Sequence, residues 1–322
     1  MPPDAPIARR LGLGLAAVGR PAYHTIAHGA DFPEGRSPEQ LQRRTHTLLD
    51  EAFEAGIRYV DAARSYGRAE AFVRAWVDAR RLRPEDFVVG SKWGYRYVGG
   101  WQIEAERHEV KDHSLGAFRA QRGESLAILG PHLSLYQVHS VTPESPALSD
   151  DALLDELAGL RDEGVRIGLT VSGARQAEVI RRSLDVERGG APLFQAVQAT
   201  WNLLEPSCEA ALRDAHAAGR QVIVKEPLAN GRLTPRGDAG TRGPLAEVAR
   251  RGGWSVDAVA LAAALARPCA DLVLLGASTV DQLRSNLAVL RLPLPSRDLA
   301  TLEALREEPE LYWANRASLR WT

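Results

Sequence analysis

The chain has 322 residues, of which 45% are hydrophobic and 25% are charged, and its formal net charge at pH 7 is −1. This length can bury a full core, either as one large α/β barrel or as two ordinary domains. The near-neutral charge gives no sequence-wide basic field, so neither nucleic acid nor an anionic membrane is expected as a partner.

Targeting and cysteine signals are weak. Residues 1–6 lack the basic and apolar regions of a signal peptide, and no uncharged apolar run approaches the roughly 20 residues that span a bilayer. Cys208 and Cys269 stand far apart, which argues against a disulfide scaffold or a cysteine-rich metal site. We therefore expect a cytoplasmic protein without a metal.

Short apolar segments alternate with helical patterns along the whole chain. The expected strands are 9–19, 57–61, 86–91, 133–138, 165–169, 193–198, 221–224 and 271–275. The expected helices are 38–55, 68–81, 114–129, 149–163, 174–183, one starting near 206, 244–251, 255–266, 279–290 and 298–307. Eight strand–helix units without a linker predict one (β/α)8 TIM barrel domain over residues 1–322. A doubly wound open sheet is the alternative.

The first strand and the loop after it contain two patterns that imitate binding motifs. Gly12, Gly14 and Gly19 loosely imitate a dinucleotide fingerprint, but the spacing is wrong and no helix follows, so we interpret them as a close-packed strand. His24 and His28 are four positions apart, and this spacing can bind a metal if both residues lie on one helix. Because a glycine and a proline follow closely, we expect a solvated loop instead.

Four chemically active side chains follow three successive strands. Asp61 and Tyr66 come at the end of one strand, Lys92 at the end of the next and His139 at the end of the third. Because neighbouring strands lie about 4.8 Å apart, these ends span only about 10 Å. An ammonium lowers the pKa of a nearby phenol, and a phenol tuned in this way can give a proton to a developing alkoxide.

Each of these residues also has a purely structural explanation. Asp61 alone suits a cap, Tyr66 a packed turn, Lys92 a buried salt bridge and His139 a core position. Because all four side chains lie at the ends of their strands, an active site is the favoured interpretation.

Three segments carry a family resemblance: residues 61–67, 91–94 and 135–139. They resemble signatures of the aldo-keto reductase superfamily, whose members are (β/α)8 barrels that transfer hydride between NADP(H) and a carbonyl or alcohol. The resemblance extends from residue 11 to about residue 292. It implies that Tyr66 is the general acid/base, that Lys92 and Asp61 tune it, and that His139 orients the carbonyl.

The same resemblance implies a cofactor site in the second half of the chain. The residues that it assigns are Ser172 and Gln198 at the nicotinamide carboxamide, Pro227, Leu228 and Gly231 along the pyrophosphate, and Gly276, Ser278, Gln282 and Asn286 around the adenosine. Independently of the family, a glycine-containing turn that opens a helix offers N–H groups to phosphate. Gly173 replaces a family asparagine, and Lys225 or Glu226 stands where many members place a stacking aromatic.

Cofactor choice depends on which cation reaches the 2′-phosphate. Gly276 stands where many members carry a lysine or arginine, which by itself favours NAD(H). Arg236 matches the place from which related barrels supply a cation, and Arg284 lies on the helix expected to receive the adenosine. Arginine suits phosphate because its planar fork binds two oxygens. We therefore expect NADP(H) to be preferred, with NAD(H) still usable.

Two other functions stay open at this stage. A regulatory cofactor-binding subunit of the potassium-channel β type has a similar fold, and a lysine-dependent barrel aldolase or epimerase would use Lys92 as a Schiff base. The substrate is expected to be a small aldehyde, ketone or sugar, in a pocket shaped by loop 93–113 and by Tyr312 and Trp313. The sequence does not define the oligomeric state.

Overall fold

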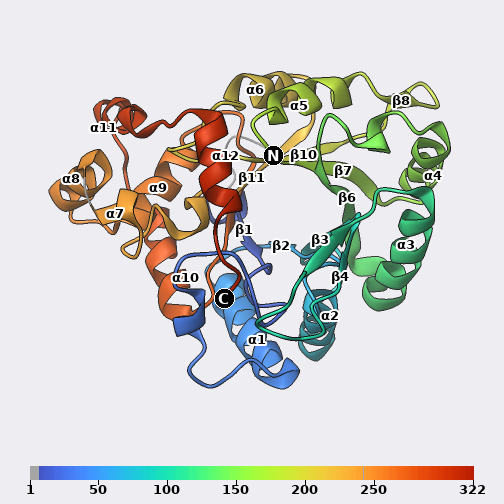
Figure 1. The fold of residues 1–322 in the computed structure, drawn as a ribbon, viewed down its shortest axis with the longest axis horizontal. Helices are drawn as coiled ribbons and strands as arrows, with labels where there is room; N and C mark the ends of the chain where they lie inside the picture. Colours follow the sequence, from blue (N-terminus) through green and yellow to red (C-terminus); the bar gives the residue numbers. More distant parts are fainter. Residues whose placement is uncertain (1–6, 242) are drawn as a thin grey trace.

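Eight parallel strands close into a barrel that is surrounded by helices (Figure 1). The structure is a computed structural model that describes residues 7–241 and 243–322. The barrel strands are β1 (Leu11–Gly14), β2 (Tyr59–Asp61), β3 (Val88–Trp93), β6 (Leu133–Val141), β7 (Arg166–Val171), β10 (Ala196–Thr200), β11 (Gln221–Lys225) and β12 (Leu272–Leu275). They are hydrogen bonded in the order β1-β12-β11-β10-β7-β6-β3-β2. The predicted (β/α)8 fold is confirmed, and the open sheet is excluded.

Every helix expected from the sequence is present, with small shifts at its ends. These helices are α1 (Pro38–Glu54), α2 (Ala69–Arg80), α3 (Leu115–Leu129), α4 (Asp151–Asp162), α5 (Gln176–Leu184), α6 (Glu209–Ala217), α8 (Gly243–Gly252), α9 (Val256–Leu265), α10 (Val280–Leu287) and α11 (Ser296–Leu302). None of the helices in the described part of the chain is long and apolar enough to cross a membrane.

The structure contains further elements that the sequence analysis did not predict. They are the short helix α7 (Asp238–Thr241), the C-terminal helix α12 (Pro309–Ala317), the hairpin β4 (Tyr95–Tyr97)–β5 (Glu109–Lys111) and the pair β8 (Glu187–Arg188)–β9 (Ala191–Pro192). The hairpin lies inside the stretch expected to be a loop. Its strands are only three residues long, which is too short for a clear alternation of polar and apolar side chains.

The start of α1 is fixed by a reciprocal cap. The Ser37 hydroxyl accepts from the backbone N–H of Gln40 at 3.3 Å, and the Gln40 side chain accepts from the backbone N–H of Ser37 at 2.7 Å. Pro38 occupies the first helical position, where a missing N–H costs nothing. This predicted cap anchors the end of the loop that connects β1 to α1. That loop contributes to the site described below.

Glycine allows a tyrosine to lie inside the barrel. A Cβ on Gly90 would lie 2.2 Å from the Tyr59 hydroxyl, and one on Gly12 would lie 2.7 Å from the Tyr59 ring. Neither contact is possible for a real side chain, so both strands need glycine here. The interpretation of Gly12 as part of a close-packed strand is confirmed.

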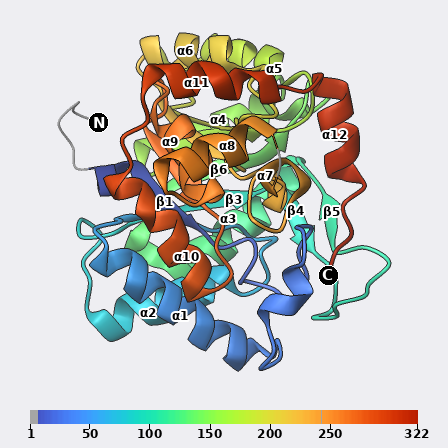
Figure 2. The same cartoon turned by 90° about the vertical axis from the view of Figure 1, so that its left-hand side faces the viewer.

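The C-terminal segment and the β4–β5 hairpin lie at the same end of the barrel (Figure 2). The Trp321 ring stacks on the His108 ring, with centroids 4.4 Å apart and planes 14° apart. The backbone N–H of Tyr23 donates to the carbonyl oxygen of Thr322 at 3.3 Å, and Thr322 N–H returns a bond to Tyr23 at 3.2 Å. The chain end is therefore tied to the first βα loop, across the carboxyl ends of the strands.

Candidate active site

The carboxyl ends of β2, β3 and β6 bring the four predicted side chains together. Nζ of Lys92 contacts the Asp61 carboxylate, donates to the carbonyl oxygen of Ala62 at 2.9 Å and lies 3.4 Å from the Tyr66 hydroxyl. The His139 ring lies 5.6 Å from the Tyr66 ring, with an interplanar angle of 80°. Asp61 and Lys92 are only 3% and 1% exposed, whereas Tyr66 and His139 keep partial exposure.

The acid–base properties of this group differ from the expectation in one respect. Burial raises the pKa of Tyr66 well above its usual range, and the negative charge of Asp61 raises it further. Burial lowers the pKa of Lys92, an effect that Asp61 opposes. The expectation that Lys92 lowers the pKa of Tyr66 overall is therefore wrong in this structure. Because Asp61 balances the ammonium charge at contact distance, burial dominates and Tyr66 is a protonated phenol at neutral pH.

His139 is a neutral imidazole at the same point. Burial lowers its pKa well below the usual range, and the positive charges of Lys92 and Lys225 lower it further. Its Nδ1 atom is buried without a hydrogen-bond partner among the described residues. A neutral ring carries one N–H and one lone pair, so it can donate to a polar oxygen of a ligand.

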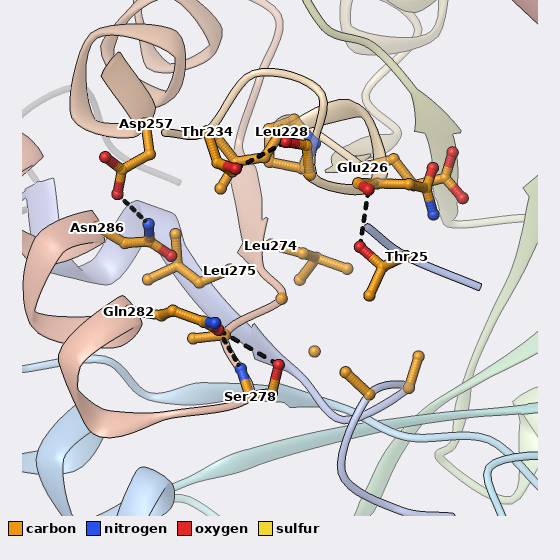
Figure 3. Close-up of a pocket in the computed structure, with 18 of the residues that line it drawn as sticks. Thr25, Glu226, Leu228, Thr234, Asp257, Leu274, Leu275, Ser278, Gln282 and Asn286 are labelled. Carbon is orange, nitrogen blue, oxygen red and sulfur yellow. Dashed lines mark hydrogen bonds between the residues drawn. The ribbon is translucent and has the colours of Figure 1, made fainter. Parts of the chain in front are cut away.

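A first cavity extends from Tyr66 to the turn between β12 and α10. Figure 3 shows part of its lining, including Glu226, Ser278 and Asn286. Nine of the ten residues predicted to bind the cofactor line it: Gln198, Pro227, Leu228, Gly231, Arg236, Gly276, Ser278, Gln282 and Asn286. The Asn286 amide donates to one oxygen of the Asp257 carboxylate at 2.7 Å, which leaves the other oxygen buried without a partner among the described residues. Gln198 Nε2 donates to Asp61 at 2.9 Å, so this cavity reaches the four side chains described above.

The end of the first cavity near α10 contains a charged cluster that the sequence analysis missed. Asp31 lies in a short 3-10 helix, η2 (His28–Asp31), and is 5% exposed. One of its oxygens lies 2.6 Å from the Arg236 guanidinium, and the other accepts from Ser278 Oγ and Gln282 Nε2, both at 2.9 Å. Three predicted cofactor residues therefore already converge on one carboxylate.

Three other residues lie in positions that the sequence did not foresee. Arg284 lies on α10 as expected, but it pairs with Glu51 at 2.6 Å on the exposed surface and does not line the first cavity. Ser172 lines a second cavity, where its hydroxyl donates to Ser140 Oγ at 3.2 Å. Gly173 has φ 96°, a backbone conformation in which an asparagine would be strained.

The second cavity has a volume of about 300 Å³ and meets the first at Tyr66. Four residues line both cavities: Tyr23, Tyr66, Lys225 and Glu226. The remaining wall includes His139 and Ser172 from the barrel, Glu109 from β5, and Arg316 and Trp321 from the C-terminal segment. Tyr66 thus lies where two separate ligands can meet.

Glu226 is held in an unusual backbone conformation at this junction. Its φ of 55° falls in the left-handed region that glutamate rarely adopts. Arg316 of α12 binds both carboxylate oxygens, with Nε 2.8 Å from Oε2, and the Thr200 hydroxyl donates to Oε2 at 3.2 Å. Burial by itself raises the pKa of Glu226, but Arg316 and Lys225 outweigh it and the net shift is downward. The carboxylate is therefore charged at neutral pH.

His28 is packed rather than solvated, so the expectation of a solvated loop is wrong at this position. The side chain is fully buried, with its ring 4.8 Å from the Phe32 ring and 6.1 Å from the Tyr23 ring. Burial lowers its pKa to about 3, which makes it a neutral core histidine. Among the residues that the structure describes, no group of three or more His, Cys, Asp or Glu side chains is placed to hold a metal ion.

Comparisons with known proteins give the family and the fold of this chain. The family model described as "Aldo/keto reductase family" matches residues 10–307. Protein tas of Escherichia coli K12 is 27% identical, with 88% of this chain and 97% of that protein covered. The uncharacterized oxidoreductase YqkF of Bacillus subtilis is 25% identical, with 84% of this chain and 90% of that protein covered. The solved holo form of aldo-keto reductase AKR11C1 from Bacillus halodurans shares the fold, with a TM-score of 0.69. It is 23% identical, and the match covers 93% of this chain and 92% of that chain.

Proposed function

The chain belongs to the aldo/keto reductase family, a family of oxidoreductases, and on that basis we propose that it transfers hydride between NADP(H) and a small aldehyde, ketone or sugar. Tyr66 is the proposed general acid/base, Lys92 and Asp61 tune it, and His139 orients the carbonyl. The observation that carries this proposal is the position of Tyr66 where two cavities meet, 3.4 Å from the Lys92 ammonium. We further propose that the protein acts in the cytoplasm, as one barrel domain over residues 1–322.

The first cavity supports a nicotinamide dinucleotide as the cofactor. Its lining residues are rich in backbone and side-chain hydrogen-bonding groups from the ends of β11 and β12. The buried, unpartnered oxygen of Asp257 is an acceptor that the amino group of an adenine can satisfy. Ser172 and Gln198 are the proposed carboxamide contacts, and Arg236 is the proposed phosphate contact. When bound, the cofactor supplies or accepts the hydride.

The proton transfer is the part of the reaction that the side chains of this protein perform. Because burial and Asp61 keep Tyr66 protonated, the phenol can donate a proton to the alkoxide that forms when a carbonyl is reduced. The phenolate left behind is stabilised by the Lys92 ammonium, which Asp61 and the Ala62 carbonyl oxygen hold in place. His139 donates its N–H to the carbonyl oxygen and so fixes the substrate beside Tyr66. The protonated phenol is the form of Tyr66 that the reductive direction requires.

The direct test is the absorbance of NADPH followed over a panel of aldehydes, ketones and sugars. Tyr66→Phe should lower turnover by about 10²–10⁴-fold, the usual contribution of a general acid, while NADPH still binds in a fluorescence titration. Tyr97→Phe is the matched control, because Tyr97 lines neither cavity. Near-normal turnover by Tyr66→Phe would show that another group supplies the proton. Cofactor binding without turnover of any compound would favour a regulatory subunit.

A further inference from the structure

The second cavity is lined by more positive than negative charge. Its ionic residues are Arg20, Lys225 and Arg316, against Glu109 and Glu226. Both carboxylates are already paired with arginine: Arg20 lies 2.5 Å from Glu109, and Arg316 binds both oxygens of Glu226. Among the described residues that line this cavity, one positive charge, that of Lys225, is therefore left without a carboxylate of its own.

Lys225 is held by a neutral partner. Its Nζ donates to the Thr200 hydroxyl at 2.8 Å. The Glu226 carboxylate, whose charge raises the pKa of Lys225, is bound by Arg316 through both oxygens. Burial lowers the pKa of Lys225 to about 8, so the side chain is mainly an ammonium at neutral pH. A partly buried cation without an anionic partner is unfavourable unless a ligand provides the charge.

The sequence gives a second reason to single out this lysine. Only three of the 40 basic residues in the chain are lysine: Lys92, Lys111 and Lys225. All the others are arginine, including those in both ion pairs of the cavity. Lysine is a compact point charge that can approach a ligand without the fixed fork of arginine, so its use at this position indicates a specific requirement.

Two further residues that line this cavity, Arg20 and His24, carry nitrogens without hydrogen-bond partners among the described residues. Arg20 is 1% exposed, and its Nε is buried without a partner among the described residues, although its NH1 donates to the Ser65 carbonyl oxygen and to Glu109. Both ring nitrogens of His24 are also buried without partners, and burial lowers the pKa of this ring to about 3, so it carries one N–H as a neutral group. A cavity with spare donors and one uncompensated positive charge suits a ligand that is rich in acceptors and carries one negative charge.

We propose that the substrate is a carbonyl compound with a carboxylate, and that this carboxylate binds to Lys225 in the second cavity while the carbonyl lies against Tyr66 and His139. The single excess charge favours a carboxylate over a phosphate, whose second charge would stay unpaired. A volume of about 300 Å³ suits a molecule of one ring or a short chain. This inference rests on the proposed function for its hydride chemistry, whereas binding of the carboxylate does not depend on turnover.

A matched pair of aldehydes tests the substrate class. We compare kcat/KM for 4-formylbenzoate and for its methyl ester, which has the same ring and aldehyde but no charge. The charged compound should be preferred by roughly 10–100-fold, which corresponds to a hydrogen bond with a charged group. Lys225→Met should lower the ratio of acid to ester by about tenfold or more. Lys225→Arg keeps the charge but not the compact shape, so it should restore only part of that ratio. Lys111→Met, a change at an exposed lysine outside the cavity, should leave the ratio unchanged.

A binding measurement separates this inference from the proposed function. Calorimetry with the Tyr66→Phe variant and saturating NADPH gives dissociation constants for the acid and the ester without conversion. The carboxylate site is supported if the acid binds more tightly than the ester and this difference is lost in a Tyr66→Phe/Lys225→Met double variant. That conclusion holds even if the wild type reduces neither aldehyde, because absence of reduction would contradict only the proposed function. Equal or tighter binding of the ester, or a preference for 4-formylphenyl phosphate over the acid, overturns the inference.

Discussion

Asp31 and the 2′-phosphate of NADP(H) are expected to compete for Arg236. In the structure the Asp31 carboxylate lies 2.6 Å from the Arg236 guanidinium and also occupies the Ser278 hydroxyl and the Gln282 amide. A phosphate that binds Arg236 has to share the site with this carboxylate or displace it. We therefore expect Asp31 to limit the preference for NADP(H) that Arg236 creates, which keeps NAD(H) usable.

The size of this effect follows from burial and distance. Two unit charges 4 Å apart interact by about 1 kcal/mol in water and by about 4 kcal/mol at the effective dielectric constant of a protein surface. Arg236 has a side chain that is 42% exposed, whereas the side chain of Asp31 is only 3% exposed, so the site lies between these limits. Asp31→Asn keeps the shape and removes the charge. It should tighten NADPH binding by about 10–100-fold, at about 1.4 kcal/mol per factor of ten, and change NADH binding little.

Fluorescence titration of both cofactors against four proteins measures this competition. The proteins are the wild type, Asp31→Asn, Arg236→Ala and Arg284→Ala, the last being a control for an arginine on the exposed surface. Arg236→Ala should weaken NADPH binding selectively, and Arg284→Ala should change neither cofactor. The reasoning is refuted if Asp31→Asn leaves the ratio of the two dissociation constants unchanged. Tighter binding of NADH than of NADPH by the wild type would overturn the proposed preference itself.

Other predictions concern the ion pairs and the buried histidine. Lys92→Met should lose turnover at neutral pH because the phenolate loses its stabilising charge, and Asp61→Asn should cause a smaller loss of turnover. A carbonyl compound trapped on Lys92 by borohydride would instead indicate a Schiff-base enzyme. Glu226→Gln should lower the free energy of unfolding in urea by about 2–4 kcal/mol because it leaves Arg316 unpaired, and removing both charges should recover part of that loss. Burial lowers the pKa of His28 to about 3. As the pH falls below about 6.5 the unfolded chain therefore binds the proton first. The free energy of unfolding should therefore fall between that pH and about 3. His28→Asn should make this dependence on pH shallower. An equal dependence on pH for the variant and the wild type, measured by urea titration, would argue against this role of His28.

The barrel and the four strand-end residues could be predicted because both follow from local patterns. Each barrel strand is a short apolar run followed by an amphipathic helix, and this alternation appears directly in the sequence. The carboxyl ends of parallel strands meet at one end of a barrel. Asp61, Lys92 and His139 each end or follow such a run, so their proximity required no knowledge of the loops.

The partners of these residues could not be predicted in the same way. Asp31 reaches Ser278 across 247 positions of the chain, through a loop whose only local signals are glycines and prolines. The sign of the pKa shift of Tyr66 was missed for a related reason. The sequence shows that a lysine and an aspartate are near, but only the structure shows that Lys92 contacts Asp61 more closely than Tyr66, which lies 3.4 Å from its Nζ.

The charged residues at the end of β11 have a partner that the sequence alone could not identify. Lys225 ends an apolar strand and Glu226 follows it directly, and buried charges require partners. That pattern indicates a polar site, yet it does not reveal which of the 40 basic residues in the chain pairs with Glu226. The structure gives Arg316, on a helix at the end of the chain, and this pair holds a residue with φ 55° in place. Because α12 neutralises Glu226 and not Lys225, it completes the wall of the second cavity and leaves the lysine charge for a ligand.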